Sequence, residues 1–103
     1  MKEIFIESIN EKKQISITFK SKEKGIITRQ CIPFDYGPWR RKLVDNPDRF
    51  HMYDLNSPDG KHNLSILPDQ IISIEKTEVV FDPKDYINWT PNWFVSRNWG
   101  KFS

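Results

Sequence analysis

The sequence predicts a mainly β, α+β fold: an N-terminal helix, then a five-stranded, strongly bent antiparallel barrel, with a tryptophan-rich C-terminal segment packed on it. Three observations support this prediction. The first residues space their apolar side chains as a helix does, and five short β-patterned segments separated by turns follow. Such strands usually curl into a partly open barrel, because closure removes exposed sheet edges. Three of the four tryptophans stand between residues 86 and 100, where their large apolar area is costly to leave in water.

Composition favours one folded domain over residues 1–103. The chain is 37% hydrophobic and 29% charged, and its net charge of +2 is too small to indicate nucleic-acid binding by itself. Glu3 and Glu7 argue against an N-terminal signal peptide, and no apolar run approaches the roughly 20 residues of a membrane span. The lone Cys31 fits a reducing compartment. We therefore expect a cytoplasmic protein without membrane association.

The N-terminal helix is predicted over residues 2–13. Phe5 and Ile9 lie four residues apart and form an apolar stripe, and Ile6 extends it. The glutamates and lysines between them supply a polar face. This spacing is typical of a helix that covers a hydrophobic core on one side.

The barrel is predicted over residues 14–81. Its first strand alternates Ile15, Ile17 and Phe19 with polar residues, which is the period of a half-buried strand. Proline and glycine signals then divide the rest into four further strands, predicted over residues 26–33, 49–55, 61–67 and 70–81. The segment between Pro33 and Asp48 is the longest irregular stretch, and long loops in compact domains are often functional.

The C-terminal segment, residues 82–103, carries two helix-start signals. Asp82 before Pro83 predicts one helical turn, and Thr90 before Pro91 predicts a short helix that continues to Asn98 and ends near Gly100. We expect Trp89, Trp93 and Trp99 to pack back onto the barrel. The alternative is a partner surface formed by Trp89, Trp93 and Arg97, since these residue types are common interface anchors.

The order of these elements, and the residues on them, resemble the WYL domain, a small SH3/Sm-like barrel of bacterial regulators. The resemblance rests on the segments Gln14–Phe19, Arg29–Pro33, Phe50–Met52 and Leu64–Ile71, and it covers about Ile4 to Glu75. The Trp-Tyr-Leu motif that names the family is not retained. The resemblance implies an SH3/Sm-like barrel and, as in family members, binding of a ligand or nucleic acid through polar and basic residues.

The sequence contains no recognisable catalytic constellation. Cys31 lies in a predicted strand, where a free cysteine usually behaves as a small core residue, so a thiolate pair with His51 or His62 is the weaker interpretation. The side chains of Cys31, His51, Asp54 and His62 lack metal-ligand spacing, and the four scattered glycines form no phosphate loop. We therefore expect a non-enzymatic protein without a metal site or cofactor.

The candidate binding residues gather in and beside the long loop. They combine aromatic and basic side chains: Tyr36, Trp39, Arg40, Arg41, Lys42, Arg49 and His51. The leading hypothesis is a regulatory module that recognises a partner protein or a small ligand through the Pro33–Asp48 loop and adjacent strands. The alternative is a single-stranded nucleic-acid binder that uses loop 36–49, aided by Lys61 and His62, with Tyr36 and Trp39 as stacking surfaces.

Overall fold

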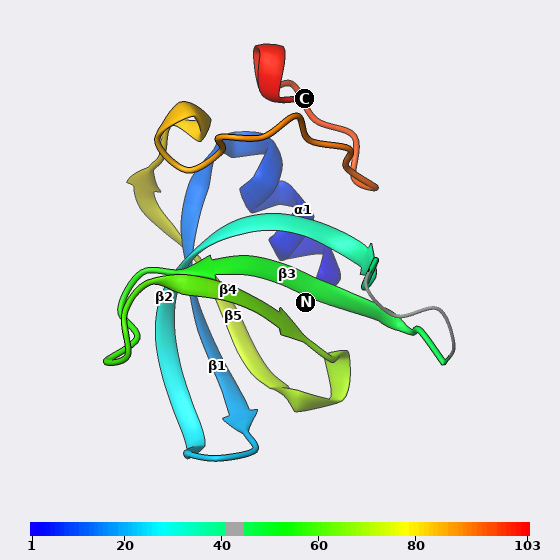
Figure 1. The fold of residues 1–103 in the computed structure, drawn as a ribbon. Helices are drawn as coiled ribbons and strands as arrows, with labels where there is room; N and C mark the ends of the chain where they lie inside the picture. The colour runs from blue at the N-terminus through cyan, green and yellow to red at the C-terminus, as the bar shows by residue number, and fades with distance from the viewer. Residues whose placement is uncertain (41–44) are drawn as a thin grey trace.

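The computed structural model describes residues 1–40 and 45–103, which form one α-helix and a single antiparallel sheet of five strands (Figure 1). The strand order is β4-β3-β2-β1-β5, so four strands follow one another as a meander and the last returns beside the first. The predicted mainly β fold, with one N-terminal helix and a bent five-stranded sheet, is confirmed, and it fits the description of a small SH3-like barrel. No helix in the described ranges is long and apolar enough to cross a membrane.

Helix α1 spans Lys2–Glu11 and buries Phe5 and Ile9 of its predicted stripe, whereas Ile6 is only half-buried. Phe5 and Ile9 have no exposed surface, and the Phe5 ring meets Phe50 of the sheet edge-on at 5.0 Å. The helix ends two residues before the predicted Lys13, because Lys12 adopts the left-handed conformation at φ 55° and directs the chain into the sheet. The stripe therefore fixes which side of α1 faces the core.

Strands β1 (Lys13–Ser21) and β2 (Gly25–Pro38) are the first two predicted strands, and they pair antiparallel as a hairpin. Strand β2 continues five residues beyond the predicted stop at Pro33, which corrects the predicted loop. The pairing register with the next strand shifts between Pro33 and Asp35. A bulge is one of the few places where a sheet tolerates proline, so the strand bends there and goes on.

The remaining strands follow the prediction closely. Strand β3 spans Asp48–Asp54, β4 spans His62–Ile66, and β5 spans Ile71–Val80 after a short 3-10 turn at Pro68–Gln70. The pairing of β5 with β1 is irregular between Lys76 and Val80. There the Thr77 hydroxyl donates a hydrogen bond to the Gln14 carbonyl at 2.7 Å.

The core lies between α1 and the inner face of the sheet. Its members are mainly Phe and Ile side chains, joined by Met52, Cys31 and Trp99. At its margin the buried Asp54 carboxylate lies 3.3 Å from the half-buried Arg29 guanidinium. Burial raises the pKa of the Cys31 thiol, so at neutral pH this side chain is a protonated core residue, not a nucleophile.

The C-terminal segment, orange to red in Figure 1, runs back past α1 and β2. The predicted turn is present as a 3-10 helix at Pro83–Asp85, where the Asp82 carboxylate accepts the Lys84 N–H at 3.1 Å. The predicted helix over residues 91–98 is wrong: this stretch is irregular, and a 3-10 turn begins only at Gly100. Contacts with the sheet, described next, replace the hydrogen bonds that a helix would have made.

Candidate ligand-binding groove

A hollow of about 720 Å³ lies between the sheet and the C-terminal segment. Strands β2, β3 and β4 form its floor, and residues 89–94 form its opposite wall. Aromatic rings from both sides line it, together with a few polar side chains. We call this hollow the aromatic groove; its aromatic lining is Phe34, Trp39, Trp89, Trp93 and Phe94.

The wall of the groove is fixed to β2 by Asp35. This carboxylate is buried and accepts the backbone N–H groups of Phe94 and Val95, each at 3.0 Å. It also pairs with the Arg97 guanidinium at 3.2 Å. Two backbone donors that a helix would have used internally are thus satisfied by one side chain from the sheet. This competition explains why the Thr90–Pro91 signal does not produce a helix.

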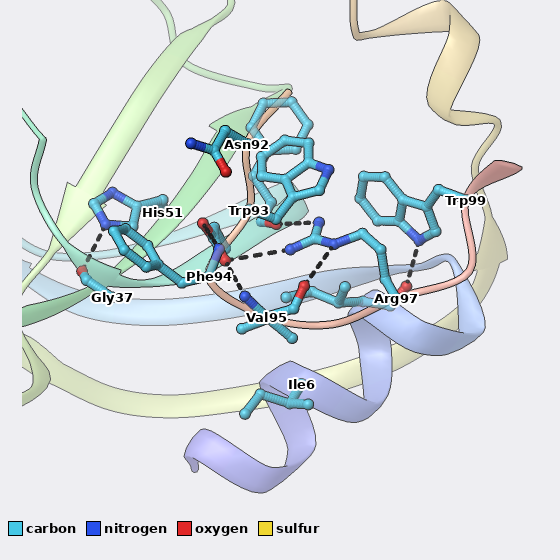
Figure 2. A network of polar contacts seen from close by, with 12 residues as sticks. Ile6, Gly37, His51, Asn92, Trp93, Phe94, Val95, Arg97 and Trp99 are labelled. Carbon is cyan, nitrogen blue, oxygen red and sulfur yellow. Dashed lines mark hydrogen bonds and ion pairs between the residues drawn. The ribbon is translucent and has the colours of Figure 1, made fainter. Parts of the chain in front are cut away.

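Arg97 is enclosed between two indole rings (Figure 2). Its guanidinium carbon lies 4.1 Å from the Trp93 ring centroid and 4.4 Å from that of Trp99, and its N–H groups also donate to the carbonyls of Phe34 and Val95. Burial lowers the pKa of Arg97 to about 10, while Asp35 acts in the opposite direction. The side chain has no exposed surface, so Arg97 does not belong to a partner surface.

The three C-terminal tryptophans differ in burial. Trp99 is 3% exposed, and its indole N–H donates to the Ile9 carbonyl of α1 at 2.9 Å. Trp93 is half-buried and donates to the Phe102 carbonyl at 2.7 Å. The Trp89 ring makes edge-to-face contacts with the rings of Trp93 and Phe34, but Trp89 remains 45% exposed. The expected packing therefore holds fully for Trp99, in part for Trp93, and least for Trp89, which faces the groove.

Gly37 of β2 allows the Phe94 side chain of the C-terminal segment to lie close against the sheet. A Cβ atom at this position would stand 2.5 Å from Cδ2 of Phe94, closer than any carbon contact allows. Above the same ring, the Arg40 guanidinium carbon lies 4.0 Å from the centroid, and Arg40 donates a hydrogen bond to the Asn92 carbonyl. Because Gly37 has no side chain, the Phe94 ring can pack between the Gly37 backbone and the Arg40 guanidinium.

Replacing Gly37 with alanine is expected to displace the Phe94 ring and to lower the free energy of unfolding by about 1–3 kcal/mol through overpacking. Denaturant unfolding followed by tryptophan fluorescence measures this cost. In a Phe94→Ala background the same change should cost clearly less, because the ring is gone and only the Cβ atom of residue 94 remains close, at 3.2 Å. Equal costs in both backgrounds would show that the close approach of Phe94 does not constrain Gly37.

His51 and Ser65 face each other across β3 and β4 on the groove floor. The His51 Nδ1 atom lies 2.8 Å from the Ser65 hydroxyl, and Nε2 lies 2.8 Å from the Gly37 carbonyl (Figure 2). A carbonyl only accepts, so the network assigns the proton to Nε2, and Nδ1 accepts from Ser65. Both side chains are therefore held in place by mutual hydrogen bonds.

Trp39 and Arg49 also line the groove. The side-chain amide of Asn46 accepts a hydrogen bond from the Trp39 backbone N–H at 2.9 Å and donates one to the Trp39 carbonyl at 2.8 Å. The Arg49 guanidinium carbon lies 5.3 Å from the Trp39 ring centroid. Its Nε atom is buried and has no hydrogen-bond partner among the described residues. The cation is positioned by packing rather than by a carboxylate.

The structure brings together Trp39, Arg40, Arg49 and His51 of the predicted site. Tyr36 is not among them: its ring packs edge-on against Phe50 at 4.8 Å, with the Lys2 ammonium 4.8 Å away, on the α1 side of the sheet. Arg41 and Lys42 lie outside the described residues. The strand register sets His62 opposite Asp54, at the other end of β3 from Arg49, so His62 does not line the groove with the predicted binding residues.

Sequence reasoning missed Ser65, Gly37 and the contribution of Phe94. Ser65 reaches the groove only through the β3–β4 register that sets it opposite His51. Among the described residues, no group of three or more His, Cys, Asp or Glu side chains is placed to hold a metal ion. Comparisons with protein-family models, curated proteins and solved structures find no match.

Proposed function

We propose that the chain is a non-enzymatic binding module that takes a small ligand in the aromatic groove. The observation that carries this proposal is the groove itself, whose volume of about 720 Å³ falls within the range of ligand pockets. Aromatic rings supply most of a ligand's contact area in such sites, and a few fixed polar groups orient it. The aromatic groove has both, with the His51–Ser65 pair on its floor.

A small ligand is favoured over a partner protein because the candidate residues line a concave surface. Protein partners usually meet flatter surfaces with a central apolar patch and a polar rim. Here Trp39, Arg49 and His51 converge on one hollow. We further propose that the barrel is a divergent relative of the WYL domain and serves as a regulatory module in a bacterial cytoplasm. The helix followed by a five-stranded barrel supports this relationship.

The test uses three naphthalene probes that differ only in charge: naphthoate, naphthamide and naphthylmethylamine. At least one is expected to bind with one-to-one stoichiometry, and Trp89→Ala should weaken that binding about 5- to 20-fold by removing one aromatic contact. Ile72→Ala is the matched control, because Ile72 on β5 is also 45% exposed but lies outside the groove. Absence of binding at millimolar concentration, or equal effects of both variants, would contradict the proposed ligand site.

The non-enzymatic part of the proposal has its own test. The Ser65 hydroxyl and the His51 imidazole form a hydrogen-bonded nucleophile–base pair, the arrangement that ester hydrolysis requires. Incubation with nitrophenyl esters is expected to give no turnover above that of imidazole in solution. Turnover that disappears in Ser65→Ala but persists in Ser73→Ala, a serine on β5 away from the groove, would make the protein an enzyme.

Single-stranded nucleic acid is the second candidate ligand. Trp39 and Trp89 are 36% and 45% exposed, and Arg40 and Arg49 lie on the same groove. Exposed aromatic rings beside arginines are the usual elements of single-strand binding. Oligonucleotide titrations at low and moderate salt separate the two candidates, since binding to phosphates weakens steeply with salt. No binding at low salt, or binding indifferent to Arg40→Gln, would remove this candidate.

A further inference from the structure

We infer that the ligand is a flat apolar carboxylic acid, bound as its anion with the carboxylate against the Arg49 guanidinium. This inference rests on the proposed ligand site and names the chemical class that the site selects. Three observations carry it: the lack of a described acceptor for Arg49 Nε, the charge balance of the described lining, and the aromatic surfaces on either side of the groove.

Within residues 1–40 and 45–103, Arg49 is a cation that lacks an acceptor. Its Nε–H group is buried without a hydrogen-bond partner, whereas buried polar groups in folded proteins are almost always paired. The Trp39 ring holds one side of the guanidinium, and register pairing with Gly37 places the arginine on the groove floor. A carboxylate matches the planar fork of an arginine with two parallel hydrogen bonds. Such an anion would supply acceptors to a guanidinium that has no acceptor among the described residues.

The charges around the groove also favour an anion. Asp35 is the acidic residue on the lining, and its carboxylate is already bonded to two backbone N–H groups and paired with Arg97. Arg40 donates to the Asn92 carbonyl and has no carboxylate partner among the described residues. Arg40 and Arg49 therefore leave the described lining with excess positive charge, which attracts an anion and repels a cation.

The remaining surface fits a flat apolar body. Trp89 and Phe94 on the wall are nearly half exposed, and Leu64 of β4 adds an apolar side chain to the lining. An aromatic ring in this hollow would contact apolar groups on both sides. A single acid group is favoured over a polyphosphate chain, because only Arg40 and Arg49 provide positive charge on the described lining.

The naphthalene probes test this inference on the full chain. Naphthoate is expected to bind at least about 10-fold more tightly than naphthamide, since charge-assisted hydrogen bonds to a carboxylate are the strong ones. Arg49→Met keeps the apolar stem over Trp39 and should reduce the affinity for naphthoate about 10- to 100-fold, with little effect on naphthamide. Lys20→Met removes the same charge from an exposed position on β1, outside the groove, and should change neither affinity.

The outcomes separate this inference from the proposed function. If naphthoate and naphthamide bind equally and Trp89→Ala weakens both, the proposed ligand site is supported, but the inference of a carboxylate ligand is wrong. Failure of all three probes to bind would overturn both. If short oligothymidylate displaces naphthoate and its affinity falls steeply with salt, the site binds phosphate, and the inference of a carboxylate ligand is wrong. Unchanged naphthamide binding in Arg49→Met serves as the evidence that this variant is folded.

Discussion

Replacing Asp35 with alanine is expected to lower the free energy of unfolding by about 3–5 kcal/mol, because it leaves the Arg97 charge buried without its partner. The same change leaves the N–H groups of Phe94 and Val95 without their acceptor, which adds to the cost. Denaturant unfolding followed by circular dichroism measures the effect. The expected loss is a large part of the stability of a small domain.

Asp59→Ala is the matched control for this prediction. Asp59 also pairs with a cation, Lys24 at 3.1 Å, but the aspartate side chain is 78% exposed. Exposed ion pairs contribute about 0–1 kcal/mol, so this variant should unfold nearly like the parent chain. The double variant Asp35→Ala, Arg97→Met should recover part of the stability that Asp35→Ala loses. Equal effects at Asp35 and Asp59 would mean that the buried pair does not hold the C-terminal segment.

Replacing Trp99 with alanine is expected to cost about 3–5 kcal/mol, the usual cost of removing a large buried aromatic side chain. The indole fills the space between α1, Phe81 and Trp93, and its N–H satisfies the Ile9 carbonyl near the end of the helix. Thermal and denaturant unfolding of the full chain measure the loss.

Trp89→Ala provides the comparison within the same segment. Because Trp89 is 45% exposed, its truncation should cost no more than about 1.5 kcal/mol. Truncation of the chain after Asn88 should abolish cooperative unfolding, since Trp99 and the partner of Asp35 are both lost. A truncated chain that melts like the parent would show that the C-terminal segment is an appendage to the barrel.

Local patterns in the sequence predict the helix and the strands well. Phe5 and Ile9 define one face of α1 by spacing alone, and the alternation of isoleucines in β1 defines its buried side. The pattern fails where a distant contact competes with a local signal. Pro33 marks a bulge inside β2 instead of a strand end, because β3 accommodates the extra residue.

The C-terminal segment shows the same competition more strongly. Thr90 and Pro91 are favourable residues for starting a helix, but Asp35 accepts the backbone N–H groups of Phe94 and Val95. These residues are separated by about 60 positions in the chain, so no local rule predicts their contact. The same limit applies to the candidate site. Residue type alone identifies Trp39 and Arg49 as binding candidates, whereas the places of Ser65 and Gly37 in the groove depend on strand register.

The most direct test of the ligand groove follows the indole N–H signals in a two-dimensional ¹H–¹⁵N spectrum during titration with naphthoate. Trp39, Trp89 and Trp93 line the groove, so their signals are expected to shift together and to saturate at one equivalent. The Trp99 N–H is bonded to the Ile9 carbonyl in the core and should stay in place. Saturable shifts of the first three signals with a fixed Trp99 signal are the predicted result. Shifts confined to Trp99, or no shifts while naphthoate binds, would place the ligand elsewhere and contradict the proposed site.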